Sequence, residues 1–185
     1  MKPHVCPWWG GYFIDNRLRR LLHKPEAILS PYARPGMTAM DFGCGMGMFS
    51  LAMAQLVGEQ GRVIAVDLQQ QMLDVLRRRA VKASLSDRID THRCEANTIG
   101  LERPIDFALA FYSAHEVPEP DRLLSEMHSL LTPAGRFLIV EPRGHVSHQQ
   151  FETMLALARD AGFAVEAEPE VRLSRAVVLG KTSQP

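Results

Sequence analysis

Cysteine, an excess of charge of either sign and long apolar runs are all missing or scarce in this 185-residue sequence. Its three cysteines, Cys6, Cys44 and Cys94, form no CxxC pair, so neither a disulfide framework nor a cysteine-based metal site is indicated. Lys plus Arg and Asp plus Glu number 21 each, so the chain lacks the basic excess that is typical of nucleic-acid-binding proteins. The basic run from Arg77 to Arg79 is interpreted as a solvated helix face.

The absence of long apolar runs bears on localisation. No run approaches the ~20 residues that a membrane-spanning helix needs. The first eleven residues contain one lysine and lack the apolar stretch of a signal peptide. We therefore expect a cytoplasmic protein without a membrane span, a nucleic-acid partner or a bound metal, and the sequence leaves its oligomeric state open.

The apolar residues follow two patterns that alternate along the chain. Short β-branched or apolar runs alternate with stretches of helical period, which is typical of an α/β protein with a mostly parallel sheet. A capping-box pattern, Ser147 to Gln150, predicts the start of a helix that Gly162 ends. Two closing strands follow with no helix between them, so they are predicted to pair antiparallel. The expected strands are 37–42, 62–67, 88–94, 105–111, 136–141, 163–170 and 174–179, and the other expected helices are 46–57, 69–84 and 120–131.

The first 35 residues differ from the rest. Residues 15–24 are basic and compatible with a helix, and an aromatic cluster that includes Trp9 and Tyr12 precedes them. This segment is too short to be a domain, so we expect residues 1–35 to lie across one end of the sheet as a lid or on the substrate side. Trp9 and Tyr12 would then line a substrate pocket, and residues 36–185 would form the main domain.

The strongest motif is Asp41-Phe-Gly43-Cys-Gly45-Met-Gly47, at a predicted strand-to-helix junction. Glycines at such a junction allow a sharp turn and let a ligand approach the backbone closely. The dinucleotide fingerprint G-x-G-x-x-G would place its last glycine at Met48, so the spacing here differs from it. An acid two residues before the first glycine suits a cationic or donor-rich ligand. A simple tight turn is the structural alternative.

Two further acids follow predicted strands. Asp67 ends the second strand, where a carboxylate can accept hydrogen bonds from ribose hydroxyls. Glu95 follows the third strand and is placed to accept a hydrogen bond from an adenine amino group. Open α/β sheets bind ligands at the carboxyl ends of their strands, where both acids and Asp41 are expected. Helix capping by Asp67 and solvent exposure of Glu95 are the alternatives.

The ordered set of motifs resembles the class I S-adenosylmethionine-dependent methyltransferases, in particular the small UbiE-like enzymes. This resemblance implies a Rossmann-like three-layer α/β sandwich, whose seven-stranded, mostly parallel sheet has the order 3-2-1-4-5-7-6 with strand 7 antiparallel. It also implies methyl transfer from S-adenosylmethionine to a small molecule, with S-adenosylhomocysteine as product. The segments that carry it are 41–47, Ala65-Val-Asp67, Cys94-Glu-Ala96, Phe107-Ala-Leu-Ala-Phe111 and 131–141.

The resemblance also implies which residues bind the cofactor. It places the methionine part over the first glycines, the ribose at Asp67, and adenine beside Leu68, Glu95 and Ala96. Two departures stand out, because Cys94-Glu-Ala replaces the usual Gly-Asp-Ala and the helix expected after it is missing. The implied cofactor-binding residues are Asp41, Gly43, Gly45, Gly47, Asp67, Leu68, Glu95, Ala96 and Phe111.

Catalytic residues are harder to infer, because a methyl group on a positively charged sulfur already has a good leaving group. Such a site mainly positions the nucleophile, and it needs a general base only for a nucleophile that arrives protonated. His115 follows the fourth strand and is the candidate base or acceptor-orienting group, with Tyr112 beside it in the pocket. Glu116, Glu141, His145 and His148 are further candidates. A nicotinamide-dependent oxidoreductase and a non-catalytic module that binds S-adenosylmethionine are the alternative functions.

Overall fold

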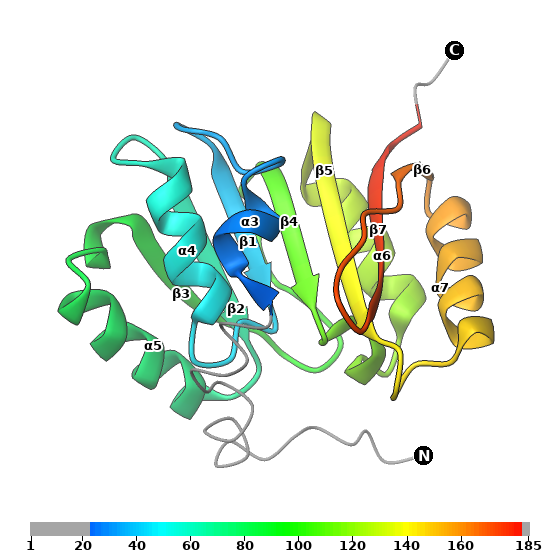
Figure 1. The fold of residues 1–185 in the computed structure, drawn as a ribbon, viewed down its shortest axis with the longest axis horizontal. Coiled ribbons are helices and arrows are strands. Elements are labelled where there is room, and N and C mark those ends of the chain that lie inside the picture. Colours follow the sequence, from blue (N-terminus) through cyan, green and yellow to red (C-terminus); the bar gives the residue numbers. More distant parts are fainter. Residues whose placement is uncertain (1–22, 183–185) are drawn as a thin grey trace.

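The computed structural model describes residues 23–182. They form three layers, and the middle layer is one seven-stranded sheet with helices on both faces (Figure 1). The strand order is β3-β2-β1-β4-β5-β7-β6, and β7 runs antiparallel to both of its neighbours. The expected order and the antiparallel closing pair are therefore confirmed. The strands are β1 (Thr38–Phe42), β2 (Arg62–Asp67), β3 (Ile89–Arg93), β4 (Ile105–Phe111), β5 (Leu131–Pro142), β6 (Phe163–Ala167) and β7 (Ser174–Lys181).

Helices cover both faces of the sheet, with α3 and α4 in front of it in Figure 1. Successive side chains of β4 point to opposite faces of the sheet, and those on both faces are buried. Phe107 and Leu109 belong to the core shared with α3, α4 and α5, whereas Ala108 and Ala110 belong to the core shared with α6 and α7. The α-helices are α3 (Pro25–Leu29), α4 (Met48–Val57), α5 (Gln70–Lys82), α6 (Pro120–Leu130) and α7 (His148–Asp160), and η2 (Ser86–Arg88) and η3 (Ala114–Glu116) are 3-10 turns.

Several element boundaries differ from those expected. The helix expected at 120–131 ends at Leu130 and β5 begins at Leu131, five residues before the expected start, because Leu131 pairs with Ile105 of β4. The strand expected at 163–170 ends at Ala167, and the short helix α3 was not predicted. The capping box is confirmed, because Ser147 Oγ accepts the N–H of Gln150 and Gln150 Oε1 accepts the N–H of Ser147.

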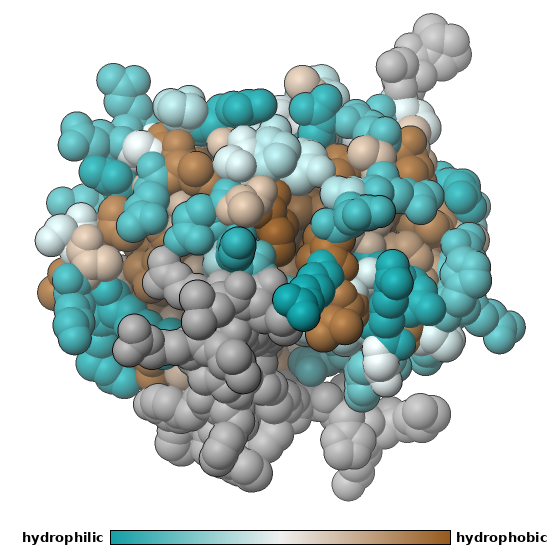
Figure 2. Space-filling model, in the orientation of Figure 1, coloured by the Kyte–Doolittle hydropathy of each residue, from teal (hydrophilic) through white to brown (hydrophobic). Residues whose placement is uncertain are grey.

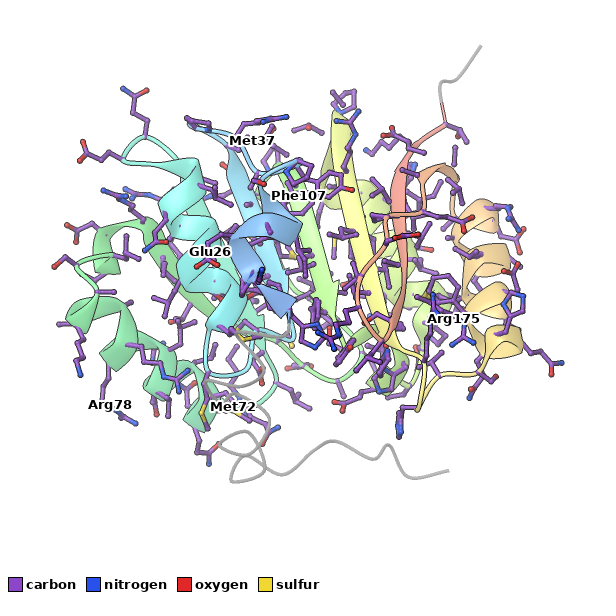
Figure 3. The ribbon with its side chains drawn as sticks, viewed as in Figure 1. Glu26, Met37, Met72, Arg78, Phe107 and Arg175 are labelled. Carbon is purple, nitrogen blue, oxygen red and sulfur yellow. The ribbon has the colours of Figure 1, made fainter. Side chains whose placement is uncertain are left out.

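The parallel strands bring their carboxyl ends to one edge of the sheet, the lower edge in Figure 1. Figure 3 shows Met72 near this edge, whereas Met37 and Phe107 lie toward the opposite edge. Figure 2 shows hydrophilic side chains around most of the outline of the same view. None of the helices between residues 23 and 182 has both the length and the apolar composition of a membrane span.

Candidate active site

A cavity of about 410 Å³ opens at the carboxyl ends of β1 to β4. Trp9 and Tyr12, predicted for the substrate side, lie outside the described residues. Gly47 is not one of the lining residues. The structure brings together at this cavity Asp41, Gly43, Gly45, Asp67, Leu68, Glu95, Ala96, Phe111, Tyr112 and His115.

The three glycines of the motif have different surroundings. A Cβ on Gly43 would lie 2.3 Å from the Cβ of Ser113, and one on Gly47 would lie 2.1 Å from Leu76 Cδ1. These two glycines therefore let the turn after β1 pack closely against the end of β4 and against α5. Gly45 has φ +53° and nothing within 4 Å of where its Cβ would be. Its backbone borders the cavity without a side chain, so a ligand can approach it closely.

Asp67 lies at the end of β2 and is largely buried, which raises the pKa of its carboxyl group, while its hydrogen bonds from backbone N–H groups oppose that rise. Oδ2 accepts the N–H of Gly45 and Oδ1 accepts the N–H of Gln69, both at 2.8 Å. The carboxylate thus supports the glycine loop as well as the start of α5. The backbone N–H of Leu68 is a third donor to this carboxylate, which can accept about four hydrogen bonds and so has capacity left for a further donor, such as a ribose hydroxyl.

Asp41, at the end of β1 next to β2, is almost fully buried and accepts a hydrogen bond from Ser50 Oγ of α4. Burial raises the pKa of Asp41 to about 7, with a smaller contribution from the charge of Asp67, while the Ser50 hydroxyl opposes the rise. A carboxyl group in this state gains most from a cationic partner, which favours its charged form. The sequence pattern did not indicate the contact with Ser50.

Glu95 and Ala96 form the rim of the cavity beyond β3. The backbone of Glu95 pairs with that of Thr98, with N···O distances of 3.2 and 3.4 Å, and both rim residues are exposed. No helix lies between Glu95 and Ile105, as the sequence indicated. Burial raises the pKa of the nearby Cys94 thiol to about 11 and that of Cys44 as well, so both thiols are neutral at physiological pH.

His115 is held by a buried carboxylate from the neighbouring strand. Glu141, at the end of β5, is 1% exposed, and its Oε2 lies 2.5 Å from Nδ1 of His115. Its Oε1 accepts the backbone N–H of His115 at 3.1 Å. The ring of His145 packs edge-on against that of His115, and both rings line the cavity. His148, on the exposed start of α7, does not line it.

Tyr112 has a backbone conformation that sequence analysis did not anticipate. Its φ of +61° lies in the left-handed region, which costs a bulky residue about 1–2 kcal/mol. Its N–H donates to Val140 O at 2.8 Å, and its hydroxyl lies 2.7 Å from Ser174 Oγ. These contacts with β5 and β7 turn the chain sharply after Phe111, on whose ring that of Tyr112 stacks.

The basic run on α5 is only partly a solvated face. Arg78 points away from the body of the protein in Figure 3. Arg79, by contrast, donates from Nη1 to the carbonyl oxygen of Met46 at 2.9 Å and so holds the glycine loop. Its spacing of three residues from the buried Leu76 places both on one side of the helix, which is the signal that could have revealed this role.

Metal binding has no candidate in the part of the chain between residues 23 and 182. No group of three or more histidine, cysteine, aspartate or glutamate side chains there could hold an ion.

Comparisons with known proteins agree with the fold and the motifs. The sequence model of a family described as "Methyltransferase domain" matches residues 33–172. A relative from Brucella anthropi, named "Ubiquinone/menaquinone biosynthesis C-methyltransferase UbiE", is 34% identical over 116 residues, which are 62% of this chain and 44% of the relative. The chain therefore spans less than half the length of the curated relatives it matches.

Solved structures extend the likeness over most of the chain. A SAM-dependent methyltransferase from Aquifex aeolicus is 26% identical, with a TM-score of 0.83, over 93% of this chain and 97% of that one. A SAM-dependent O-methyltransferase from Thermotoga maritima is 17% identical, with a TM-score of 0.70, over 88% of this chain and 66% of that one, and it shares the fold.

Proposed function

The chain belongs to the methyltransferase domain family, and on that premise we propose that it transfers the methyl group of S-adenosylmethionine to a small-molecule acceptor. One observation carries this proposal. Acids from the ends of three strands, Asp41, Asp67 and Glu95, meet an open glycine loop around one cavity of about 410 Å³. This donor and acceptor set suits a ligand that has a cationic amino group, ribose hydroxyls and an adenine amino group.

Each part of the cofactor has a chemically matched partner in the cavity. Asp67 has acceptor capacity left for a ribose hydroxyl, and Asp41 gains from the amino group of the methionine part. Glu95 accepts from adenine, whose ring lies between Leu68 and Ala96, and Gly45 leaves room for close approach. When bound, S-adenosylmethionine supplies an electrophilic methyl group on a positively charged sulfur.

The residues of this chain contribute position and the exclusion of water. Met46, Met48, Phe49, Met72 and Phe111 give the cavity largely apolar walls. A site that excludes water and aligns the acceptor with the methyl carbon lowers the barrier to in-line displacement. The aromatic rings of Phe49, Phe111 and Tyr112, which contact one another beside the cavity, are also proposed to interact with a positively charged sulfur.

Carbon is the first candidate for the acceptor atom. The Brucella relative is named as a C-methyltransferase of ubiquinone and menaquinone biosynthesis. The apolar walls of the cavity suit an aromatic ring as the acceptor. Trp9 and Tyr12 are proposed to cover the acceptor. Within the segment 1–35 that was expected to form a lid, Leu29 and Ala33 are instead buried in the core beside α4, so only the part of the segment before α3 is proposed as the lid on the substrate side.

Calorimetric titration tests the proposal directly. The purified chain is titrated with S-adenosylhomocysteine, which is stable and cannot react, and in parallel with NADH and NADPH. Binding of S-adenosylhomocysteine alone, at one site per chain, is the expected result. Binding of a nicotinamide nucleotide alone would overturn it in favour of redox chemistry. Binding of S-adenosylhomocysteine without turnover on any acceptor would favour a non-catalytic module.

A further inference from the structure

The side chain of Glu141 makes two hydrogen bonds to the same neighbouring residue. One of its oxygens accepts the backbone N–H of His115, and the other faces Nδ1 of the His115 ring at 2.5 Å. Because Glu141 is 1% exposed, water competes little for either oxygen. The two bonds together determine both the position and the rotation of the imidazole.

With Glu141 ionised, this arrangement assigns the hydrogen to one ring nitrogen of His115. A carboxylate only accepts hydrogen bonds, so Nδ1 must be the donor. In the neutral ring Nε2 then has a lone pair, and it lies on the side of the ring away from Glu141. Since the ring lines the cavity, Nε2 is the basic atom that His115 can offer to a bound acceptor.

The charges around His115 strengthen it as a base. Burial lowers the pKa of His115, but the hydrogen bond and charge of Glu141 and the charge of Glu116 outweigh burial and raise it. Glu141 faces the ring from β5, Glu116 from its own 3-10 turn, and the ring of His145 from the loop after β5. A raised pKa makes the neutral imidazole a stronger base toward a protonated acceptor.

We propose, on the basis of the methyl transfer inferred above, that Nε2 of His115 removes the proton of a hydroxylated aromatic or enolic acceptor. Glu141 is the positioning residue that acts through His115. The O–H bond breaks and its proton moves to Nε2. An electron pair of the resulting oxyanion, on oxygen or on the conjugated carbon, bonds to the methyl carbon. The carbon–sulfur bond breaks with its electrons remaining on sulfur, and the imidazolium later releases the proton to water.

The acceptor class follows from the need for a base. A thiolate or a neutral amine already has a free electron pair and gains little from deprotonation before attack. A phenol or enol is a weak nucleophile at neutral pH, but its oxyanion is a strong one at oxygen and at the conjugated carbon. A buried carboxylate that holds a histidine at the cavity wall therefore fits a hydroxyl acceptor best.

A series of phenols of increasing acidity tests the role of His115. The probes are unsubstituted phenol, para-cyanophenol, para-nitrophenol and pentafluorophenol, together with resorcinol, which can be methylated at oxygen or at carbon. Products are identified by mass spectrometry and NMR. The variant is His115→Asn, because the Asn amide can still donate to Glu141 but has no atom in place of Nε2. His148→Asn, on the exposed start of α7, is the matched control.

The expected result is a loss that depends on the acidity of the acceptor. His115→Asn should lower kcat for phenol on the order of 100-fold or more, and much less for pentafluorophenol, which is already ionised at pH 8. His148→Asn should match the wild type throughout. An equal loss for every phenol would indicate a structural role and overturn the proposal.

Two other outcomes separate this inference from the proposed function. If the wild-type chain binds S-adenosylhomocysteine but methylates none of the phenols, the acceptor class is wrong and the proposed function stands. If it does not bind S-adenosylhomocysteine, both proposals are wrong.

The pH dependence tests Glu141. Because neutral His115 is the active form, kcat/KM should rise with pH and level off above the pKa of His115. Glu141→Gln removes the charge that raises the pKa of His115, so the rising part of the pH profile should move to lower pH while the plateau rate falls. A lower plateau with an unmoved rising part would show that Glu141 is only structural.

Discussion

Gly45 donates its backbone N–H to Oδ2 of Asp67 at 2.8 Å, although 22 residues separate the two in the chain. This hydrogen bond ties the glycine loop after β1 to the end of β2. The residue expected to bind the ribose therefore also shapes the loop that borders the methionine part. Variants at Asp67 must be interpreted with both contributions in mind.

Asp67→Ala should weaken the binding of S-adenosylhomocysteine by roughly 1–3 kcal/mol, the usual cost of losing hydrogen bonds to a charged group. Asp67→Asn should lose less, because one amide oxygen still accepts a hydrogen bond. Calorimetry gives both affinities, and thermal unfolding shows whether each variant is folded. Unchanged affinity in a folded Asp67→Ala protein would contradict the ribose role.

Asp41 should make the stability of the protein depend on pH. Its pKa of about 7 in the folded chain lies above the ordinary 3.8, so folding favours the protonated form. This contribution is complete below about pH 4 and is lost as the pH rises through 7, with a total of at most about 4 kcal/mol. Denaturant unfolding at pH 5 and pH 8 should show a fall in wild-type stability that is clearly smaller in Asp41→Asn. Equal falls in both proteins would refute the assignment.

The same group predicts proton release on cofactor binding. S-adenosylhomocysteine has a cationic amino group, which favours the charged form of Asp41 and so lowers its pKa. Titrations at pH 6 in buffers with different ionisation enthalpies should therefore reveal a fraction of a proton released per molecule bound. Asp41→Asn should abolish that release, and a release that persists in the variant would point to another group.

Gly45→Ala tests whether the open backbone of the loop serves ligand binding. Both Gly45 and Gly36 have positive φ values and nothing within 4 Å of where a Cβ would be, but only Gly45 lines the cavity. Each alanine variant should lose about 1–2 kcal/mol of stability, the usual cost of the left-handed conformation. Only Gly45→Ala should also weaken S-adenosylhomocysteine binding, by tenfold or more. Similar affinities in the two variants would remove the ligand role of Gly45.

Gly43→Ala should destabilise the protein for two reasons, because Gly43 shares the positive φ of Gly45, at +68°, and also lacks space for a side chain. Its added Cβ would lie 2.3 Å from that of Ser113, so β1 and the segment after β4 would have to separate. Overpacking of this kind costs about 1–3 kcal/mol. The double variant Gly43→Ala with Ser113→Gly removes the clash but leaves the φ strain and loses the hydrogen bond from Ser113 Oγ to Phe42 O, so thermal unfolding should show a smaller loss than the sum of the two single variants. A loss equal to that sum would show that the contact is not a cause.

Much of the fold was predictable because each strand and helix carries its own local signal. The alternation of buried strands with helices of clear period indicated the layers, and the motif order that resembles a known family implied the strand order. The start of β5 at Leu131 was not predictable, because Pro133 and Gly135 are residues that normally interrupt a strand. The pairing of Leu131 with Ile105 outweighs that local preference.

Within the site, single residues were easier to predict than pairs. Asp41 and Asp67 lie at the ends of strands and Glu95 lies just after one, so their positions alone indicated the cavity. The contact between His115 and Glu141 depends on the neighbouring positions of β4 and β5 and on two side-chain rotamers, which a sequence does not display. The positive φ of Tyr112 likewise arises from contacts with β5 and β7, far away in the sequence.

The pairing of β4 with β5 has a consequence for how this protein can change. Phe111 lies opposite Val140, so the ladder places Glu141 just beyond the end of β4, within reach of His115. A slip of one residue would turn Glu141 to the other face of the sheet and break the pair. The connection around Gly144, which has nothing within 4 Å of where a Cβ would be, lies outside this ladder and can lengthen without disturbing it. An insertion in this loop can therefore change which acceptor binds while the contact between His115 and Glu141 stays in place.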